Sequence, residues 1–68
     1  MDFPAALQNA QAWMQEVDGV EAVGETTQDG RKCIYVYVTQ PEAARTLPYE
    51  FYGYRVVVQQ GPPIQANK

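Results

Sequence analysis

Apolar residues near the start of the chain follow a helical period. Five of them recur at spacings of four and three on one helical stripe: Phe3, Leu7, Ala10, Met14 and Val17. Pro4 suits the first helical position, where its missing N–H costs nothing, and Asp2 lies just upstream, where a carboxylate favours the helix dipole. The pattern predicts one helix over residues 4–17, with Gly19 as its left-handed cap.

Three later segments have the composition and alternation of β-strands. They span residues 20–27, 31–39 and 54–60. Asp29-Gly30 between the first two is a strong hairpin signal. Segment 31–39 carries apolar side chains on both faces, which predicts a central strand. Gly24 predicts a bulge or a close backbone approach in the first strand.

The link between the second and third strands contains residues 41–46, which predict a short helical turn begun by Pro41 and closed by Leu47-Pro48. This link is long enough for a parallel crossover, although an antiparallel return also fits. We therefore expect an α+β fold of one domain over residues 1–68. In it, an N-terminal helix packs on a three-stranded mixed or antiparallel sheet, and residues 61–68 form a tail.

The composition is that of a small globular domain without covalent support. Apolar residues make up 46% of the chain, which argues against disorder. Cys33 is the only cysteine and histidine is absent, so neither an intramolecular disulfide nor a zinc site of the usual kind can form. The domain then either relies on packing alone, for a net stability on the order of 3–5 kcal/mol, or gains buried area by forming a dimer.

The net charge and the hydropathy of the chain limit the classes of partner and the cellular locations that fit it. A net charge of −3 argues against nucleic acid, because phosphate contacts require a concentrated basic surface. The N-terminus lacks the features of a signal peptide, and no apolar stretch reaches the roughly 20 residues of a membrane-spanning helix. A free cysteine fits a reducing compartment. The sequence predicts a cytoplasmic protein that binds neither nucleic acid nor membrane.

A string of turn and strand residues runs through residues 20–66. Its recognisable parts are Val23-Gly24, Asp29-Gly30, Leu47-Pro48, Gly53-Tyr54 and Gly61-Pro62-Pro63-Ile64. The string resembles a short α-β-β-β module of small uncharacterised bacterial proteins, and a similar stretch precedes some trypsin-like peptidase domains. The resemblance implies a fold and no activity. A serine-protease triad cannot be carried over, because the chain contains neither histidine nor serine.

Residues that carry chemistry are few. Cys33 has no histidine to activate it, and strand alternation directs Lys32 to the opposite face, so we interpret Cys33 as a small strand residue. Glu16, Asp18 and Glu21 cluster near the helix end but fit no calcium-loop spacing. The sequence predicts no catalytic, cofactor-binding or metal-binding residue, and hence no enzyme.

Aromatic side chains are concentrated in the second half of the chain. Six lie within twenty residues: Tyr35, Tyr37, Tyr49, Phe51, Tyr52 and Tyr54. One helix covers only one face of a sheet, so Tyr35 and Tyr37 face away from the helix if Ile34 faces it. Two interpretations remain open. The aromatic residues form an interaction surface, or residues 41–53 fold over them and make a minor core.

Two functions follow from these observations. The first is a non-catalytic protein-interaction module that uses the tyrosine-rich face or an exposed edge strand, either 54–60 or 20–26. Its partner would be an unknown protein or a second copy of the chain. The alternative is a small-molecule binding domain, with a pocket between the tyrosine residues and the loop at 41–53.

Overall fold

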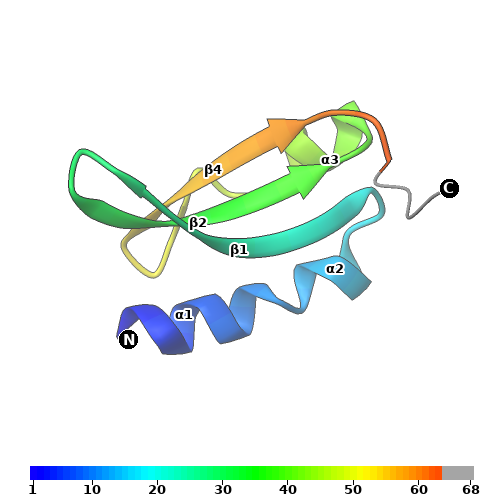
Figure 1. The fold of residues 1–68 in the computed structure, drawn as a ribbon. Helices are drawn as coiled ribbons and strands as arrows, with labels where there is room; N and C mark the ends of the chain where they lie inside the picture. The colour runs from blue at the N-terminus through cyan, green and yellow to red at the C-terminus, as the bar shows by residue number, and fades with distance from the viewer. Residues whose placement is uncertain (64–68) are drawn as a thin grey trace, which may run out of the picture.

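The protein folds into a four-stranded sheet with short helices packed against it, and a computed structural model describes residues 1–63 (Figure 1). The elements in chain order are α1 (Phe3–Ala10), α2 (Trp13–Glu16), β1 (Val20–Gln28), β2 (Arg31–Val38), α3 (Pro41–Thr46), β3 (Glu50–Phe51) and β4 (Tyr54–Gln60). The predicted α+β class is confirmed.

The strands lie in the order β1-β2-β4-β3. β1 and β2 pair antiparallel, β2 and β4 pair parallel, and β3 pairs antiparallel with β4. α3 lies within the crossover from β2 to β4, as a parallel connection requires. The mixed sheet and the central position of residues 31–38 are therefore confirmed, whereas the expected count of three strands is wrong.

The strand that the sequence does not reveal is β3. It is only two residues long, too short to show a strand period, and it pairs Phe51 with Tyr54 through a two-residue turn. Tyr52 and Gly53 in this turn both have positive φ, 53° and 86°, much like Asp29 and Gly30 at 52° and 78°. Tyrosine rarely adopts this conformation, so Tyr52-Gly53 gives a weaker hairpin signal than Asp29-Gly30.

The predicted helix over residues 4–17 is interrupted, and this prediction needs correction. Asp2 caps α1 by accepting a hydrogen bond from the Ala5 N–H at 3.1 Å. Around Gln11 and Ala12 the hydrogen bonds change to the tighter three-residue spacing, and α2 then begins at Trp13. The tighter turn rotates Trp13 toward the sheet and leaves Met14 40% exposed. The expected place of Met14 in the apolar stripe is therefore wrong.

The expected irregularity at Gly24 is also wrong. Gly24 pairs with Tyr35 in regular register, and nothing lies within 4 Å of the position that its Cβ would take. The register shifts between Val20 and Ala22 instead, where the chain passes from α2 into the sheet. The extra residue is accommodated at that junction, so Gly24 has no special conformation to adopt.

The hydrophobic core lies on one side of the sheet. Ile34, Val36 and Val38 of β2 are fully buried there. Each helix contributes to the same core: α1 through Phe3, Ala6 and Ala10, α2 through Trp13, and α3 through Ala43. Small alanine side chains let α1 and α3 approach the strands closely, and burial of this apolar surface is the main stabilising contribution.

The end of β4 leads into the tail expected over residues 61–68. The Gly61 N–H donates to the Val38 carbonyl at 3.1 Å, so pairing with β2 continues one residue beyond the strand. Residues 64–68 of the expected tail lie outside the described residues. Within residues 1–63 no helix has the length and apolar character needed to cross a membrane.

Candidate interaction surface

The face of the sheet opposite the helices carries a row of partly exposed side chains. Because successive side chains alternate between the faces, Tyr35 and Tyr37 project away from the core that buries Ile34 and Val36. The parallel register places Val57 beside Tyr35. We call this surface the open face and define it by its residues: Ala22, Gly24, Thr26, Gln28, Arg31, Cys33, Tyr35, Tyr37, Arg55, Val57 and Gln59.

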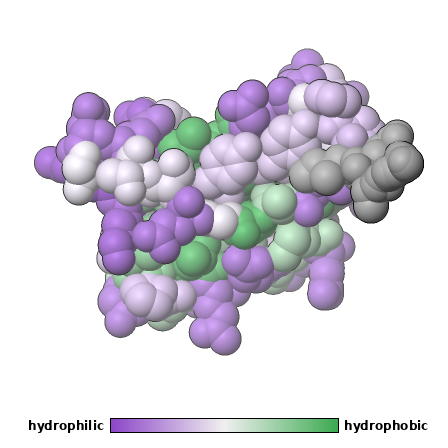
Figure 2. Space-filling view, viewed as in Figure 1, coloured by the Kyte–Doolittle hydropathy of each residue, from purple (hydrophilic) through white to green (hydrophobic). Residues whose placement is uncertain are grey.

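The middle of the open face is weakly polar and half-buried. Tyr35, Tyr37 and Val57 are each intermediate in exposure, whereas Gln59 at the end of β4 is exposed. In Figure 2 a pale band of side chains with intermediate hydropathy crosses the visible surface, next to green apolar patches. Such a mixture of aromatic rings with polar tips is typical of protein-binding surfaces.

Residues 41–53 do not cover the open face. Ala43 and Leu47 are buried in the core on the helix side, so residues 41–47 lie against the other face of the sheet. Beyond them, Tyr49 packs against Arg55 at the groove, and β3 joins the edge of the sheet. The interpretation that 41–53 makes a minor core over Tyr35 and Tyr37 therefore has no support within residues 1–63.

Tyr37 holds the chain that follows β4. Its hydroxyl donates to the Pro62 carbonyl at 2.6 Å, and a Cβ at Gly61 would collide with the same hydroxyl. The backbone of Gly61 therefore passes close to the tyrosine ring, where only glycine leaves enough space. This contact fixes the orientation of Tyr37 on the open face.

Tyr37→Phe tests this contact. Removal of the hydroxyl deletes a hydrogen bond at an exposed site, so we expect a loss of about 0.5–1.5 kcal/mol in the free energy of unfolding. Amide shifts at Gly61 should change while those at Ala6 in α1 stay constant. Unchanged stability together with an unchanged Gly61 signal would contradict the contact.

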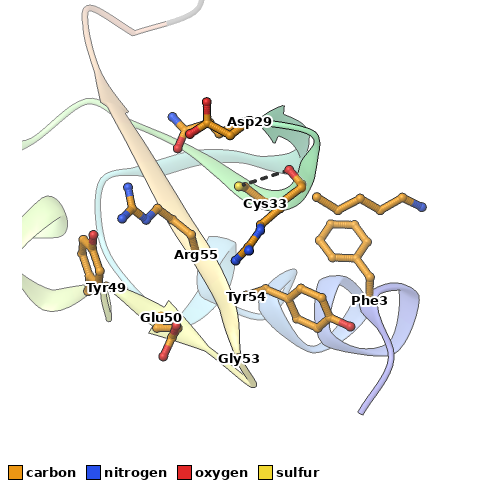
Figure 3. Close-up of a pocket in the computed structure, with 11 residues that line it drawn as sticks. Phe3, Asp29, Cys33, Tyr49, Glu50, Gly53, Tyr54 and Arg55 are labelled. Atoms are coloured by element: carbon orange, nitrogen blue, oxygen red, sulfur yellow. Dashed lines mark hydrogen bonds between the residues drawn. The ribbon is translucent and has the colours of Figure 1, made fainter.

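A groove of about 820 Å³ lies at one end of the sheet, between the β1–β2 turn and the β3–β4 turn. In Figure 3 Arg55 extends from β4 between Tyr49 and Cys33, and Tyr54 and Phe3 lie on the other side of the strand. The groove is lined by Phe3, Gln28, Asp29, Arg31, Lys32, Cys33, Tyr49, Glu50, Gly53, Tyr54 and Arg55. We call it the hairpin groove.

The hairpin groove gathers three of the five cations of the chain, Arg31, Lys32 and Arg55. Two of them lie over aromatic rings. The Lys32 ammonium is 5.6 Å from the centroid of Phe3, and the Arg55 guanidinium carbon is 4.6 Å from the centroid of Tyr49. Cation–π attraction favours these directions for the flexible side chains and does not neutralise their charge.

Cys33 lies at the junction of the open face and the hairpin groove. It is 3% exposed, and its thiol donates to the Arg31 carbonyl at 3.5 Å. These observations agree with a small, buried strand residue. Among residues 1–63, no three side chains of the histidine, cysteine, aspartate and glutamate types gather into a potential metal site.

The six aromatic residues singled out in the sequence do not share one surface. Tyr35 and Tyr37 lie on the open face, whereas Tyr49 lines the hairpin groove. Tyr54 also lines the groove, and its ring packs edge-on against Phe3 of the core with 5.1 Å between centroids. The Phe51 ring packs against Trp13 at 4.8 Å, whereas Tyr52 packs against Phe51 and is 55% exposed.

Sequence reasoning missed the cations of the hairpin groove. Arg31 and Arg55 are distant in sequence and line the same groove because β2 and β4 are neighbouring, parallel strands. The parallel pairing was one of two open alternatives, so no sequence pattern placed the two arginines together. Alternation of side chains along a strand is the one sequence signal that bears on them. It assigns Arg31 to the face of Tyr35 and Arg55 to the face of Val57.

The sheet edges differ from one another. On the outer side of β1, the Gln11 side-chain amide donates to the Val23 carbonyl at 3.2 Å and so occupies part of that edge. On the other side, β3 pairs only with Tyr54 and Arg55, and the Tyr49 carbonyl accepts from the Val56 N–H at 2.9 Å. Strand β4 extends past β3 to Gln60, so its second half forms the more accessible edge.

Comparison with protein-family models, with curated proteins and with solved structures finds no match for this chain. The resemblance to a bacterial α-β-β-β module stays a prediction.

Proposed function

We propose that this protein is a non-catalytic interaction module that binds a protein partner, or a second copy of itself, through the open face. One observation carries the proposal. Helices α1, α2 and α3 contribute to the core on one side of the sheet, while Tyr35, Tyr37 and Val57 are neighbours on the other. Tyrosine rings bury a large area at low conformational cost, which suits a binding surface.

The open face supports the proposal better than the strand edges do. The Gln11 side chain donates a hydrogen bond to the Val23 carbonyl on the β1 edge, and β3 pairs with the start of β4. Short edge strands and side-chain caps of this kind limit strand addition. The accessible edge is thereby reduced to the last residues of β4.

A pair of adjacent residues separates binding by the open face from binding by the helix side of the sheet. Gln59 and Gln60 are both exposed, but the register places Gln59 beside Tyr37 on the open face and Gln60 beside Val38 on the helix side. Because Cys33 is buried, a bulky maleimide attaches to the new cysteine of Gln59→Cys or Gln60→Cys. Association is measured by sedimentation over a dilution series and by recovery of partners on the tagged protein.

We expect the adduct at position 59 to abolish association and the adduct at position 60 to leave it intact. Loss of association only with the adduct at position 60 would assign binding to the helix side of the sheet. Equal loss with both adducts would assign it to the β4 edge, which carries both residues. Either result would contradict the proposed face. Equal association of the two adducts and the unlabelled protein, or no association in any of them, would also contradict the proposal.

The hairpin groove favours a second function, binding of a small molecule. Its volume of about 820 Å³ lies within the range of ligand pockets, and it combines aromatic rings with charged groups. Native mass spectrometry of the freshly purified protein tests this function. A retained mass that is lost in Tyr49→Ala would support it, and a protein of bare mass would contradict it.

The proposal includes a cytoplasmic location, which rests on the free thiol of Cys33. It includes neither nucleic-acid nor membrane partners, because the chain carries a net charge of −3, which opposes binding to anionic phosphates.

A further inference from the structure

We infer that the hairpin groove binds carboxylate side chains of an acidic partner segment, whose remaining residues lie along the open face. The inference rests on the proposed function and adds the chemistry of the partner. It follows from the continuity of two surfaces, from the placement of the cations, and from the shape of the groove.

The hairpin groove and the open face are continuous. Along β2, Arg31 and Cys33 line the groove and are followed on the same face by Tyr35. Along β4, Arg55 lines the groove and is followed by Val57. Same-face residues of a strand are about 7 Å apart, so an extended segment that covers Tyr35 and Val57 reaches the two arginines within a few residues.

The net charge of the groove lining is opposite in sign to the net charge of the whole chain. Its lining carries three cations and two carboxylates, Asp29 and Glu50, giving a formal charge of +1, whereas the whole chain carries −3. An acidic segment is therefore repelled by the rest of the protein and attracted at this end, which fixes its direction along the open face.

The arginines suit carboxylates in geometry as well as charge. Arg31 and Arg55 are exposed, and the ring of Tyr49 supports the guanidinium of Arg55. A planar guanidinium that stacks on a ring keeps its N–H groups at its edge, where a carboxylate can accept two hydrogen bonds at once. Lys32 alternates to the helix side, over Phe3, so its charge reaches the groove from the other face of the sheet.

The groove is shaped for a chain rather than an enclosed ligand. Among its lining residues only Phe3 and Cys33 are buried and Tyr54 is half-buried, and the others are exposed. Small-molecule sites usually bury most of the ligand surface. The hairpin groove is open and continues onto the open face. It therefore suits an extended polypeptide that contacts both surfaces.

The experiment uses the full chain, labelled with ¹⁵N, and a peptide of alternating glutamate and valine as the probe. Amide shifts are followed as the peptide is added, at low and at high salt. A matched peptide with glutamine in place of glutamate tests the role of charge, and free glutamate tests whether a small anion suffices. Arg31→Gln and Arg55→Gln remove groove cations, and Arg45→Gln removes the same charge from α3, outside the groove.

We expect the acidic peptide to move the signals of Arg31, Cys33 and Arg55, and high salt to weaken the effect. Each groove variant should weaken binding by about threefold to tenfold, while Arg45→Gln matches the unmodified protein. Equal binding of the glutamine peptide, equal loss in Arg45→Gln, or saturation of the groove by free glutamate would overturn the inference.

An acidic peptide that produces no shifts would also overturn the inference. The proposed function is tested separately by the adducts at positions 59 and 60. Suppose that only the adduct at position 59 abolishes association while the peptide leaves the groove signals unchanged. The open face is then still an interaction surface, and only the inference that its partner is acidic is disproved.

Discussion

Ile34→Ala is expected to lower the free energy of unfolding by about 2–5 kcal/mol. Ile34 is fully buried at the centre of β2, where the core receives side chains from all three helices. Its truncation removes apolar contacts and leaves a cavity that a tightly packed domain refills only in part. A domain of this size has a net stability on the order of 3–5 kcal/mol, so the substitution should remove most of that stability.

Urea denaturation followed by the fluorescence of Trp13, the only tryptophan, measures this effect. Ile34→Val, with an expected loss of about 0.5–1.5 kcal/mol, keeps the measurement possible if the alanine variant is already unfolded. Val57→Ala on the open face is the control, because Val57 is only half-buried. Equal losses for Ile34→Ala and Val57→Ala would show a core on both faces and contradict the one-sided arrangement.

Gly19→Ala is expected to cost about 2–3 kcal/mol, the second large effect. Gly19 joins α2 to β1 with φ of +95°, which L-residues rarely adopt. A Cβ at this position would lie 3.0 Å from Cβ of Gln40 and 3.2 Å from Cβ of Ala43. Conformational strain and crowding against α3 therefore act together.

Gly24→Ala provides the matched control within β1. Gly24 has an ordinary strand conformation and open space around its Cβ position. Loss of backbone freedom in the unfolded chain should make the protein more stable by about 0.4–1 kcal/mol. Thermal unfolding of both variants gives the comparison. A Gly19→Ala variant as stable as Gly24→Ala would disprove the close approach of the α2–β1 connection to α3.

Local patterns predicted the main elements well because each pattern has a direct physical cause. Alternation placed β1, β2 and β4 within one residue of their ends, and Asp29-Gly30 supplied the backbone conformation of their hairpin. The apolar stripe predicted a helical N-terminal segment. It did not predict the tighter turn at Gln11, because apolar residues three or four apart fit both kinds of helical winding.

The candidate surfaces depend on pairings between distant segments, which the sequence leaves open. Aromatic content drew attention to six residues, yet the register assigns only Tyr35 and Tyr37 to the open face and directs Phe51 and Tyr54 toward the helices. The hairpin groove exists because parallel pairing brings Arg55 beside Cys33. Composition showed an acidic chain and could not show that most of its cations gather at one end.

The most direct test of the central claim is an amide-shift map of the labelled protein across a dilution series and with cell lysate added. Signals of Tyr35, Tyr37 and Val57 should move with concentration or lysate. Signals of Ala6 and Ala43, buried on the helix side, should stay constant. Unmoved signals across the open face, or movement confined to the helix side, would contradict the claim that this face binds a partner.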